Sequence, residues 1–447
     1  MTSIGFPNMP ACIEDSRRAV DDPEQGPADP EDFDGLLARL AGAHRKLPRL
    51  YRRVVYRPYR AELQDLGEDE FDSILAADPQ REGEASLVLD IAHAILQNGE
   101  GYNRLATDAY QEVVADLYDG FLSAEDRAGV KPPDHGVVAP LVKWGSPESG
   151  PYTWSVDSTS EYGSAAAIVS LPPSHARSGL MGWSALGHET AGHDILHADD
   201  GLLLELKHNV REALAAKKLP GDLPTYWADR IDETASDVLG ILNMGPAAGI
   251  GLIAYFRGFD KHSRLSSVGA ADDDHPADIL RGYLAAETVR LLAFKASAAW
   301  AEALTRETSR DVGVIRLAGR TVNPEAVRRS AMIVAHVLVR RPLRSLEGRA
   351  LEQIQNWRER DEKVVADLRR VLQSSQPVRY KRTTGHYAAH TVAAAVYEAL
   401  RSKGADVTRI FRRMLAILKT MHNDNPAWGP QFLSRSERVR PHLARKR

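Results

Sequence analysis

Two histidines and a glutamate stand close together in the segment 188–193, whose sequence is HETAGH. A second acidic segment, DETASD, follows at residues 232–237. Two imidazoles and a carboxylate are ligands with which proteins hold a catalytic zinc ion while leaving a fourth position for water. The two segments together predict one Zn2+ ion per chain and a metal-dependent hydrolase.

The spacing of the histidines predicts a distorted helix. They lie five residues apart, and a step of five residues turns about 140° around a regular helix, against about 40° for a step of four. One extra residue absorbed as a π-type bulge brings both imidazoles to the same side, and Gly192 suits such a turn. We therefore expect a helix from Ser184 to about His197 that contains a π bulge.

The HExxGH pattern, with a downstream acidic pair and a further acid, resembles the motifs of the dipeptidyl-peptidase III family of zinc peptidases, which are zincin-like and gluzincin-like enzymes. The resemblance is confined to these two segments. It implies that His188, His193 and Glu233 bind the metal and that Glu189 is the catalytic base. Asp237 corresponds to the last acid of the second motif. The resemblance thus implies a metallopeptidase, a protease that acts on a peptide or protein substrate.

The residue types fit this chemistry by themselves. A carboxylate beside a zinc ligand can take the proton of a zinc-bound water and later protonate the leaving amine, which is the role expected of Glu189. Asp237 can accept the second N–H of a ligand histidine and so fix its tautomer. The sequence therefore predicts zinc-dependent peptide-bond hydrolysis by water that Glu189 activates.

Two other functions fit parts of the same sequence. His193 and His197 lie four residues apart with Asp194 after the first of them, which is similar to the HD phosphohydrolase superfamily of all-helical metal enzymes. His175, in a loop expected over 174–179 that could overhang a cleft, is the nearest upstream ligand for that alternative. A noncatalytic metal-containing binding protein is the third hypothesis. A structural zinc site based on cysteine is excluded, because Cys12 is the single cysteine.

Three further residues are candidates for stabilising an oxyanion. His275 precedes Pro276 in a segment that leads to Arg281, although the acids before it equally suit the start of a helix. His386 and Tyr387 lie in a C-terminal segment that could fold over the site. His386 and His390 are expected to share a helical face, which is more typical of a structural pair than of a second metal site.

Composition limits the class of protein. The chain has 447 residues, 43% hydrophobic content and a net charge of −4, which suits one large or two ordinary globular domains. No apolar run reaches the length of a membrane span, so no membrane partner is expected. The single cysteine and the lack of a signal-like start predict a cytoplasmic protein, or one secreted without a signal.

The pattern of residues predicts a mainly α protein with a small β-sheet, an α+β fold with a zincin-like core flanked by helical lobes. We expect a disordered acidic leader over 1–35, an N-terminal helical lobe over 36–135, the metal-binding core over 136–310 and a C-terminal helical lobe over 311–447. The β-prone runs are 137–144, 152–156 and 165–171. Residues 165–169 are the candidate edge strand for pairing with a peptide, or else an ordinary core strand.

The C-terminal lobe ends in a basic tail. Nucleic acid is an unlikely partner for it, because no nucleic-acid-binding module or interleaved aromatic residues accompany the basic residues and the acidic leader offers an internal partner. The basic residues of the tail are Arg435, Arg438, Arg440, Arg445, Lys446 and Arg447.

Overall fold

A computed structural model describes residues 4–30, 32–81, 83–122, 133–135, 138–219, 222–378, 380–381 and 385–429. The basic tail lies outside these residues. The described chain is mainly helical and carries two small mixed sheets of three strands each, which confirms the α+β class. Among the described residues, no helix is both long enough and apolar enough to cross a membrane.

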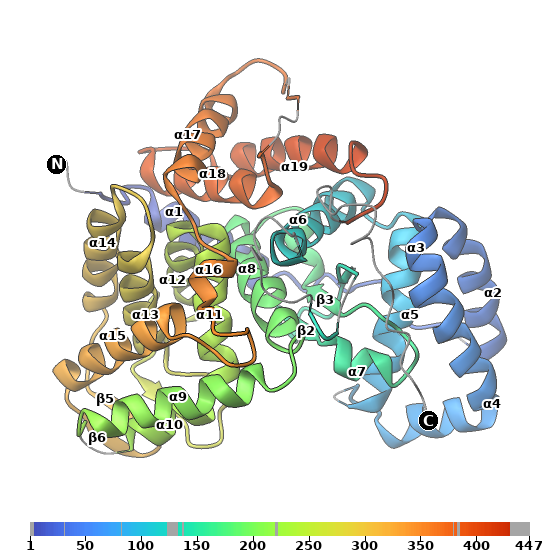
Figure 1. Ribbon diagram of the computed structural model, residues 1–447. Helices are drawn as coiled ribbons and strands as arrows, with labels where there is room; N and C mark the ends of the chain where they lie inside the picture. The colour runs from blue at the N-terminus through green and yellow to red at the C-terminus, as the bar shows by residue number, and fades with distance from the viewer. Residues whose placement is uncertain are drawn as a thin grey trace.

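The N-terminal helices pack around a hydrophobic cluster of their own, which includes Phe33, Leu40, Tyr59 and Ile91. In Figure 1 they form the blue layer on the right. Asp32 caps the first of them by accepting from the backbone N–H of Gly35. The elements of this layer are α2 (Phe33–Ala43), the 3-10 turn η1 (His44–Lys46), α3 (Arg49–Tyr51), the π-helix η2 (Arg52–Tyr56), α4 (Arg57–Ala77) and α5 (Glu84–Glu100).

The first sheet separates this layer from the central helices. Its strands are β1 (Leu141–Trp144), β2 (Tyr152–Trp154) and β3 (Ile168–Leu171), in the order β1-β3-β2. Successive side chains alternate between the two faces, so that Ile168 joins the N-terminal cluster while Val169 joins the main core. β3 is parallel to β1 and antiparallel to β2. Of the two interpretations of 165–169, the core strand is therefore correct, and β2 is an edge strand.

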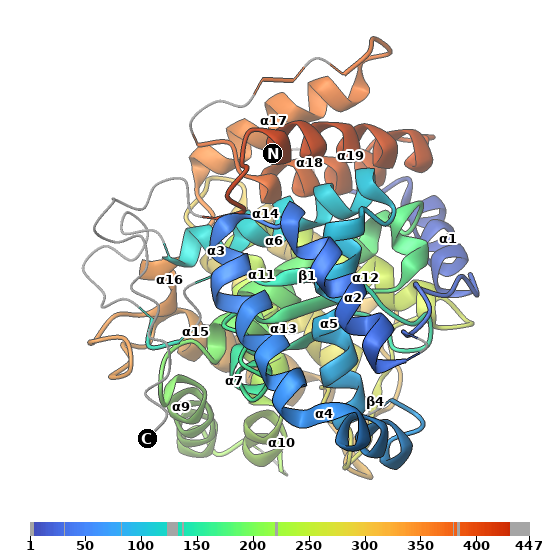
Figure 2. The same cartoon turned by 90° about the vertical axis from the view of Figure 1, so that its right-hand side faces the viewer.

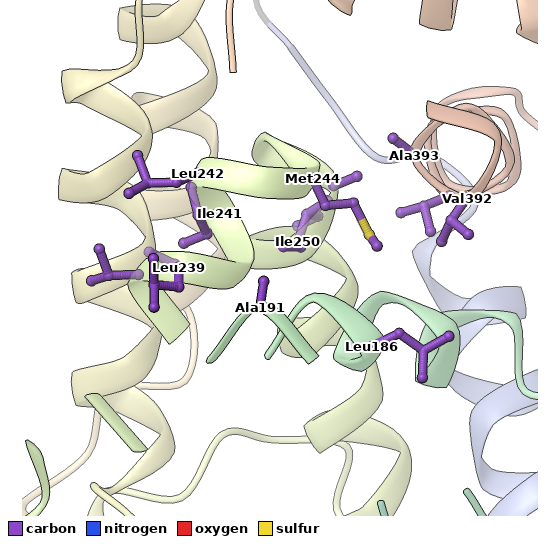
Figure 3. Packing of buried hydrophobic residues seen from close by; sticks show 14 of the residues in the cluster. Leu186, Ala191, Leu239, Ile241, Leu242, Met244, Ile250, Val392 and Ala393 are labelled. Carbon is purple, nitrogen blue, oxygen red and sulfur yellow. The ribbon is translucent and has the colours of Figure 1, made fainter. Parts of the chain in front are cut away.

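The central helices carry the two chemical motifs. A 3-10 helix, η4 (Leu180–Ala185), leads into α8 (Leu186–His188) and then into a π-helix, η5 (Glu189–Asp194). The π bulge predicted from the histidine spacing is confirmed. The second motif lies on α11 (Ile231–Met244), which α12 (Pro246–Phe259) and α13 (Asp278–Leu291) follow. Figure 3 shows Ala191 pointing toward the apolar side chains of α11 and α12, including Ile241 and Ile250.

C-terminal helices cover the other sides of this centre. α17, α18 and α19 lie across the top of Figure 1, α13–α15 lie at its left, and α9 (Leu202–Ala216) and α10 (Leu223–Asp229) lie at its base. Val392 and Ala393 of α18 pack near Met244, as Figure 3 shows. The bounds are α14 (Ser297–Ser309), α15 (Pro324–Arg340), α16 (Leu351–Ile354), α17 (Glu359–Gln373), α18 (Ala388–Arg401) and α19 (Val407–Asn423).

The remaining elements are a second sheet and further helices, of which α6 contributes Tyr110, Val113 and Val114 to the main core. A second sheet has the order β4-β5-β6, with β4 parallel and β6 antiparallel to β5. These elements are α6 (Arg104–Leu122), α7 (Val156–Ser160), α9 (Leu202–Ala216), α10 (Leu223–Asp229), β4 (Val268–Gly269), β5 (Ile315–Leu317) and β6 (Arg320–Val322).

The prediction of a disordered leader is wrong for its first part, because residues Met9–Val20 form helix α1. Met9, Cys12 and Ile13 are buried in the main core. Asn8 anchors the start of this helix by donating to the carbonyl oxygens of Ala399 and Ala405, at 2.8 and 3.1 Å. The acidic composition predicted disorder, whereas the apolar face of α1 is covered by helices from distant parts of the sequence.

Two smaller expectations are also wrong. The segment expected to overhang a cleft instead begins with a buried 3-10 turn, η3 (Pro173–Ala176), and His175 packs against Tyr255. Helix α18 begins at Ala388, so that His386 precedes it and does not share a helical face with His390. His390 instead caps the start of the helix, where its Nδ1 accepts from the backbone N–H of Tyr387 at 3.0 Å.

Candidate metal centre

Close packing of two helices brings the motifs together. A Cβ atom at Gly187 would lie 3.2 Å from the Cα of Gly240, and one at Gly192 would lie 2.3 Å from the Cβ of Ser236. Only glycine allows the backbone of α8 and η5 to approach α11 this closely. Glu233, Ser236 and Gly240 are spaced three and four residues apart and therefore lie on one face of α11. That face meets the histidine segment.

Three predicted ligands converge at this contact. Nε2 of His188 lies 3.0 Å from Nε2 of His193. The two carboxylate oxygens of Glu233 lie 3.3 Å from Nε2 of His188 and 3.2 Å from Nε2 of His193. The donor atoms of the three residues all lie within 4.8 Å of one another. The π bulge therefore brings both imidazoles to the same side of the helix, where the carboxylate of Glu233 faces them.

Two aspartates fix the orientation of the imidazoles. Nδ1 of His188 lies 2.8 Å from Asp237, and Nδ1 of His193 lies 2.9 Å from Asp232. If each Nδ1 donates its proton to the aspartate, each Nε2 presents a lone pair to the other. Two lone pairs that face each other beside a carboxylate repel unless a proton or a cation lies between them. The donor set of two imidazoles and a glutamate matches the preferences of zinc.

The electrostatics of the cluster favour a cation. Burial lowers the pKa of His188, but the carboxylates of Glu233 and Asp237 outweigh it and raise the pKa to about 9. The pKa of His193 is also raised well above its ordinary value, against the effect of burial. Burial raises the pKa of Glu233, but the histidines and Arg281 hold it well below the usual range. Without a metal, the cluster therefore binds protons.

We expect zinc binding by the metal-free protein to release about one proton or more at pH 7. His188, with a pKa of about 9, carries a proton at that pH and must lose it before Nε2 can coordinate. Metal affinity should therefore increase as the pH rises toward 9. Calorimetric titration with zinc in two buffers of different ionisation enthalpy measures the released protons. Release of none would contradict a protonated His188.

Arg281 completes the polar surroundings of the cluster. It is buried, and it donates to both oxygens of Asp237, from Nε at 2.8 Å and from Nη2 at 2.7 Å. Its Nη2 also lies 3.7 Å from Glu233. Such a bidentate guanidinium keeps Asp237 ionised and fixes the carboxylate that orients His188. The position of Asp237 agrees with the orienting role predicted for it.

Glu189, the predicted base, is buried and attached to the first sheet. The hydroxyl of Thr153 on β2 donates to Oε2 of Glu189 at 2.8 Å and lies 3.2 Å from its backbone carbonyl oxygen. Burial lowers the pKa of His193, but Asp232, Glu233 and, after them, the charge of Glu189 raise it. The carboxylate of Glu189 therefore lies near the cluster of His188, His193 and Glu233, and an edge strand fixes its position.

His275 lies beside the cluster, on its solvent-exposed side. Its Nε2 is 3.4 Å from Oε1 of Glu233, and its Nδ1 is 3.0 Å from Asp273. Its side chain is 59% exposed. The acids at 272–274 do not begin a helix, as the alternative explanation expected, because α13 begins only at Asp278. His275 is therefore placed where an incoming substrate could contact it.

Tyr387 and His386 are not brought to the cluster. Tyr387 lines a small cavity with Leu242 and Asn243, at the opposite end of α11 from Glu233. Leu242 follows Glu233 by nine positions on the helix, which corresponds to a distance of about 14 Å along the helix axis. His386 lies beside Tyr380, with Nδ1 3.2 Å from the hydroxyl. The C-terminal helices cover α12 and the C-terminal end of α11 rather than His188, His193 and Glu233.

The arrangement does not support the HD alternative. The carboxylate oxygens of Asp194 are buried without a hydrogen-bond partner, and they are not part of the ligand cluster found among the described residues. His197 contacts Asp232 at 3.2 Å and Asp157 at 3.6 Å, so it touches an orienting aspartate rather than the ligand atoms. His175 lies in a separate packing contact with Tyr255.

Sequence reasoning missed the contacts of Thr153 and Asp232. No pattern in the sequence indicates that the middle residue of a three-residue strand reaches the glutamate of a helix that follows much later. The contact of Asp232 could have been predicted, because an acid that precedes a candidate ligand on the same helix can reach the neighbouring histidine. No family model, curated protein or solved structure matches this chain.

Proposed function

We propose that the protein is a zinc-dependent metallopeptidase. The observation that carries the proposal is the convergence of His188, His193 and Glu233 within 4.8 Å, next to a glutamate in the chain. The described residues supply three protein ligands, and a catalytic zinc site typically has three and leaves a further position open. When bound, the metal would polarise a scissile carbonyl and lower the pKa of a water molecule.

The residues of the chain would carry out the other steps of the reaction. Glu189 accepts a proton from the attacking water and returns it to the leaving amine. Thr153 holds the Glu189 carboxylate at 2.8 Å, which limits its rotation. Asp232 and Asp237 keep the ligand imidazoles in the tautomer that presents Nε2. His275 donates to the oxyanion that develops on the substrate.

A peptide substrate fits the surroundings of the cluster. β2 is an edge strand of the first sheet, and its central residue contacts the proposed base. An extended peptide that adds to the edge of a sheet gains main-chain hydrogen bonds, independent of its sequence. A peptide along β2 would place a main-chain carbonyl beside Glu189. This geometry favours an extended peptide over a compact phosphoester as the substrate.

The experiment that tests the proposal is hydrolysis of a peptide library, followed by mass spectrometry. We expect cleavage by the zinc-loaded protein, loss after chelation and recovery when zinc is restored. A parallel assay with phosphomonoester and phosphodiester substrates covers the HD alternative. Metal binding without cleavage of any peptide would contradict the proposal and favour a noncatalytic metal protein.

Replacing Thr153 with valine should reduce peptide hydrolysis about tenfold to a hundredfold without loss of the metal. The hydroxyl donates to the ionised base, and such a charged hydrogen bond contributes about 1.5–3 kcal/mol. Valine keeps the shape and β preference of the strand. Kinetics and metal content of Thr153→Val check this. Thr321→Val on the exposed strand β6 is the matched control, and an equal loss of activity there would contradict the role of Thr153.

A further inference from the structure

The most basic segment of the chain lies outside the metal centre. Residues 44–60 carry seven lysines and arginines and no aspartate or glutamate, in a protein whose net charge is −4. The segment runs through η1, α3, η2 and the first turn of α4. α3 lies on the side of the molecule that Figure 2 turns toward the viewer. The basic residues are Arg45, Lys46, Arg49, Arg52, Arg53, Arg57 and Arg60.

Four of these arginines surround one cavity. Arg49, Arg52, Arg53 and Arg57 line it together with His44, and its volume is about 280 Å3. No acidic side chain is among the described residues that line it. Arg52 and His44 are half-buried, while the other three arginines are exposed at the rim. A concave surface with one sign of charge concentrates the electrostatic field and attracts counter-ions.

The four guanidinium groups have no carboxylate partner in the part of the chain that the structure describes, within the 4.0 Å that defines an ion pair. Some other surface arginines are paired, as Arg39 is with Glu100 at 3.0 Å. Nε of Arg52 and Nδ1 of His44 are buried and lack a hydrogen-bond partner. Buried polar atoms are normally satisfied, so these two indicate a missing partner.

The cavity is built on rigid backbone. The ring of His44 stacks on the ring of Tyr56, with centroids 4.1 Å apart and an interplanar angle of 5°. Val54 and Val55 of the π-helix are buried, and the carbonyl oxygen of Val54 accepts from the backbone N–H of Ala165 at 3.0 Å. The arginines therefore project from a segment that is hydrogen-bonded to the residues leading into β3. Such a site needs little reorganisation to bind a ligand.

We infer that this cavity binds the phosphate or diphosphate group of a phosphate-bearing ligand. The planar guanidinium presents paired N–H donors that match the oxygens of phosphate. Four positively charged side chains around a small cavity suit a multivalent anion. The site shares no residue with the metal centre, so the inference is independent of the proposed peptidase activity.

Calorimetric titration of the full chain with inorganic pyrophosphate at fixed ionic strength tests the inference. Vesicles of phosphatidylcholine with and without phosphatidic acid form a second arm, because a phosphate group can belong to a soluble molecule or to a lipid headgroup. Arg49→Gln/Arg57→Gln removes two exposed guanidiniums without removing a described contact, and Arg52→Gln removes the half-buried one. Arg329→Gln/Arg412→Gln removes the same charge from exposed positions elsewhere.

We expect binding of pyrophosphate by the native chain and a loss of about tenfold or more for each guanidinium removed from the cavity. The Arg329→Gln/Arg412→Gln variant should bind as the native chain does. Binding only to vesicles with phosphatidic acid, with the same dependence on the variants, would assign the phosphate to a lipid. Absence of binding in both arms, or an equal loss in the control variant, would overturn the inference.

Discussion

Glu189→Gln should reduce peptide hydrolysis by about 10²–10⁴-fold, the usual contribution of a general base. The amide keeps the size of the side chain and can still contact the Thr153 hydroxyl, but it cannot accept a proton from water. The metal ligands His188, His193 and Glu233 are unchanged by this substitution. Steady-state kinetics on a cleaved library peptide, with metal content measured on the same sample, checks both parts of the expectation.

Glu302→Gln provides the matched control, since Glu302 is exposed on α14 and the substitution is chemically identical. It should leave the rate unchanged. Full activity in Glu189→Gln with its metal retained would contradict the role of this glutamate. Loss of the metal together with activity would instead make Glu189 part of the metal site.

Gly192→Ala should lower the free energy of unfolding by about 1–3 kcal/mol, the usual cost of forcing an extra carbon into a packed contact. The added Cβ would lie 2.3 Å from the Cβ and 2.5 Å from the Cα of Ser236, so η5 and α11 would have to separate. That separation also moves His193 away from Glu233, so zinc affinity should decrease. Chemical denaturation of the metal-free protein measures the first effect and zinc titration the second.

Gly42→Ala is the control for this substitution. Gly42 lies within helix α2, and nothing lies within 4 Å of a Cβ built there, so alanine should be neutral or slightly stabilising. Adding Ser236→Gly to Gly192→Ala should recover part of the lost stability, because it removes the contacts with Cβ and Oγ of Ser236 at 2.3 and 2.6 Å and leaves that with Cα. Equal stability of Gly192→Ala and the native protein would show that the helix contact is not as close as described.

The convergence of His188 and His193 could be predicted from sequence because local geometry determines this part of the candidate site. A spacing of five residues between the histidines requires an irregular turn, and a glycine beside the second histidine permits one. The structure shows a π-helix over Glu189–Asp194. The resemblance to the peptidase motifs pointed to Glu233 and Asp237, and their spacing of four residues places both on one face of α11.

Features that depend on distant parts of the chain could not be predicted. The order of the three strands makes β2 an edge and β3 a central strand, and nothing in the runs 152–156 and 165–171 determines that order. The contact between Thr153 and Glu189 follows from the same topology. Tyr387 was expected at the site from residue type alone, whereas the packing of α18 on α11 and α12 places it near Leu242.

The most direct test of the central claim is the metal content of the purified chain after zinc is supplied, measured by mass spectrometry beside His188→Ala, Glu233→Ala and His197→Ala. We predict about one zinc per chain, lost in the first two variants and retained in His197→Ala, whose side chain contacts Asp232 rather than the ligand atoms. Zinc retained without His188 or Glu233, or no zinc in the native chain, would contradict the assignment of the metal centre.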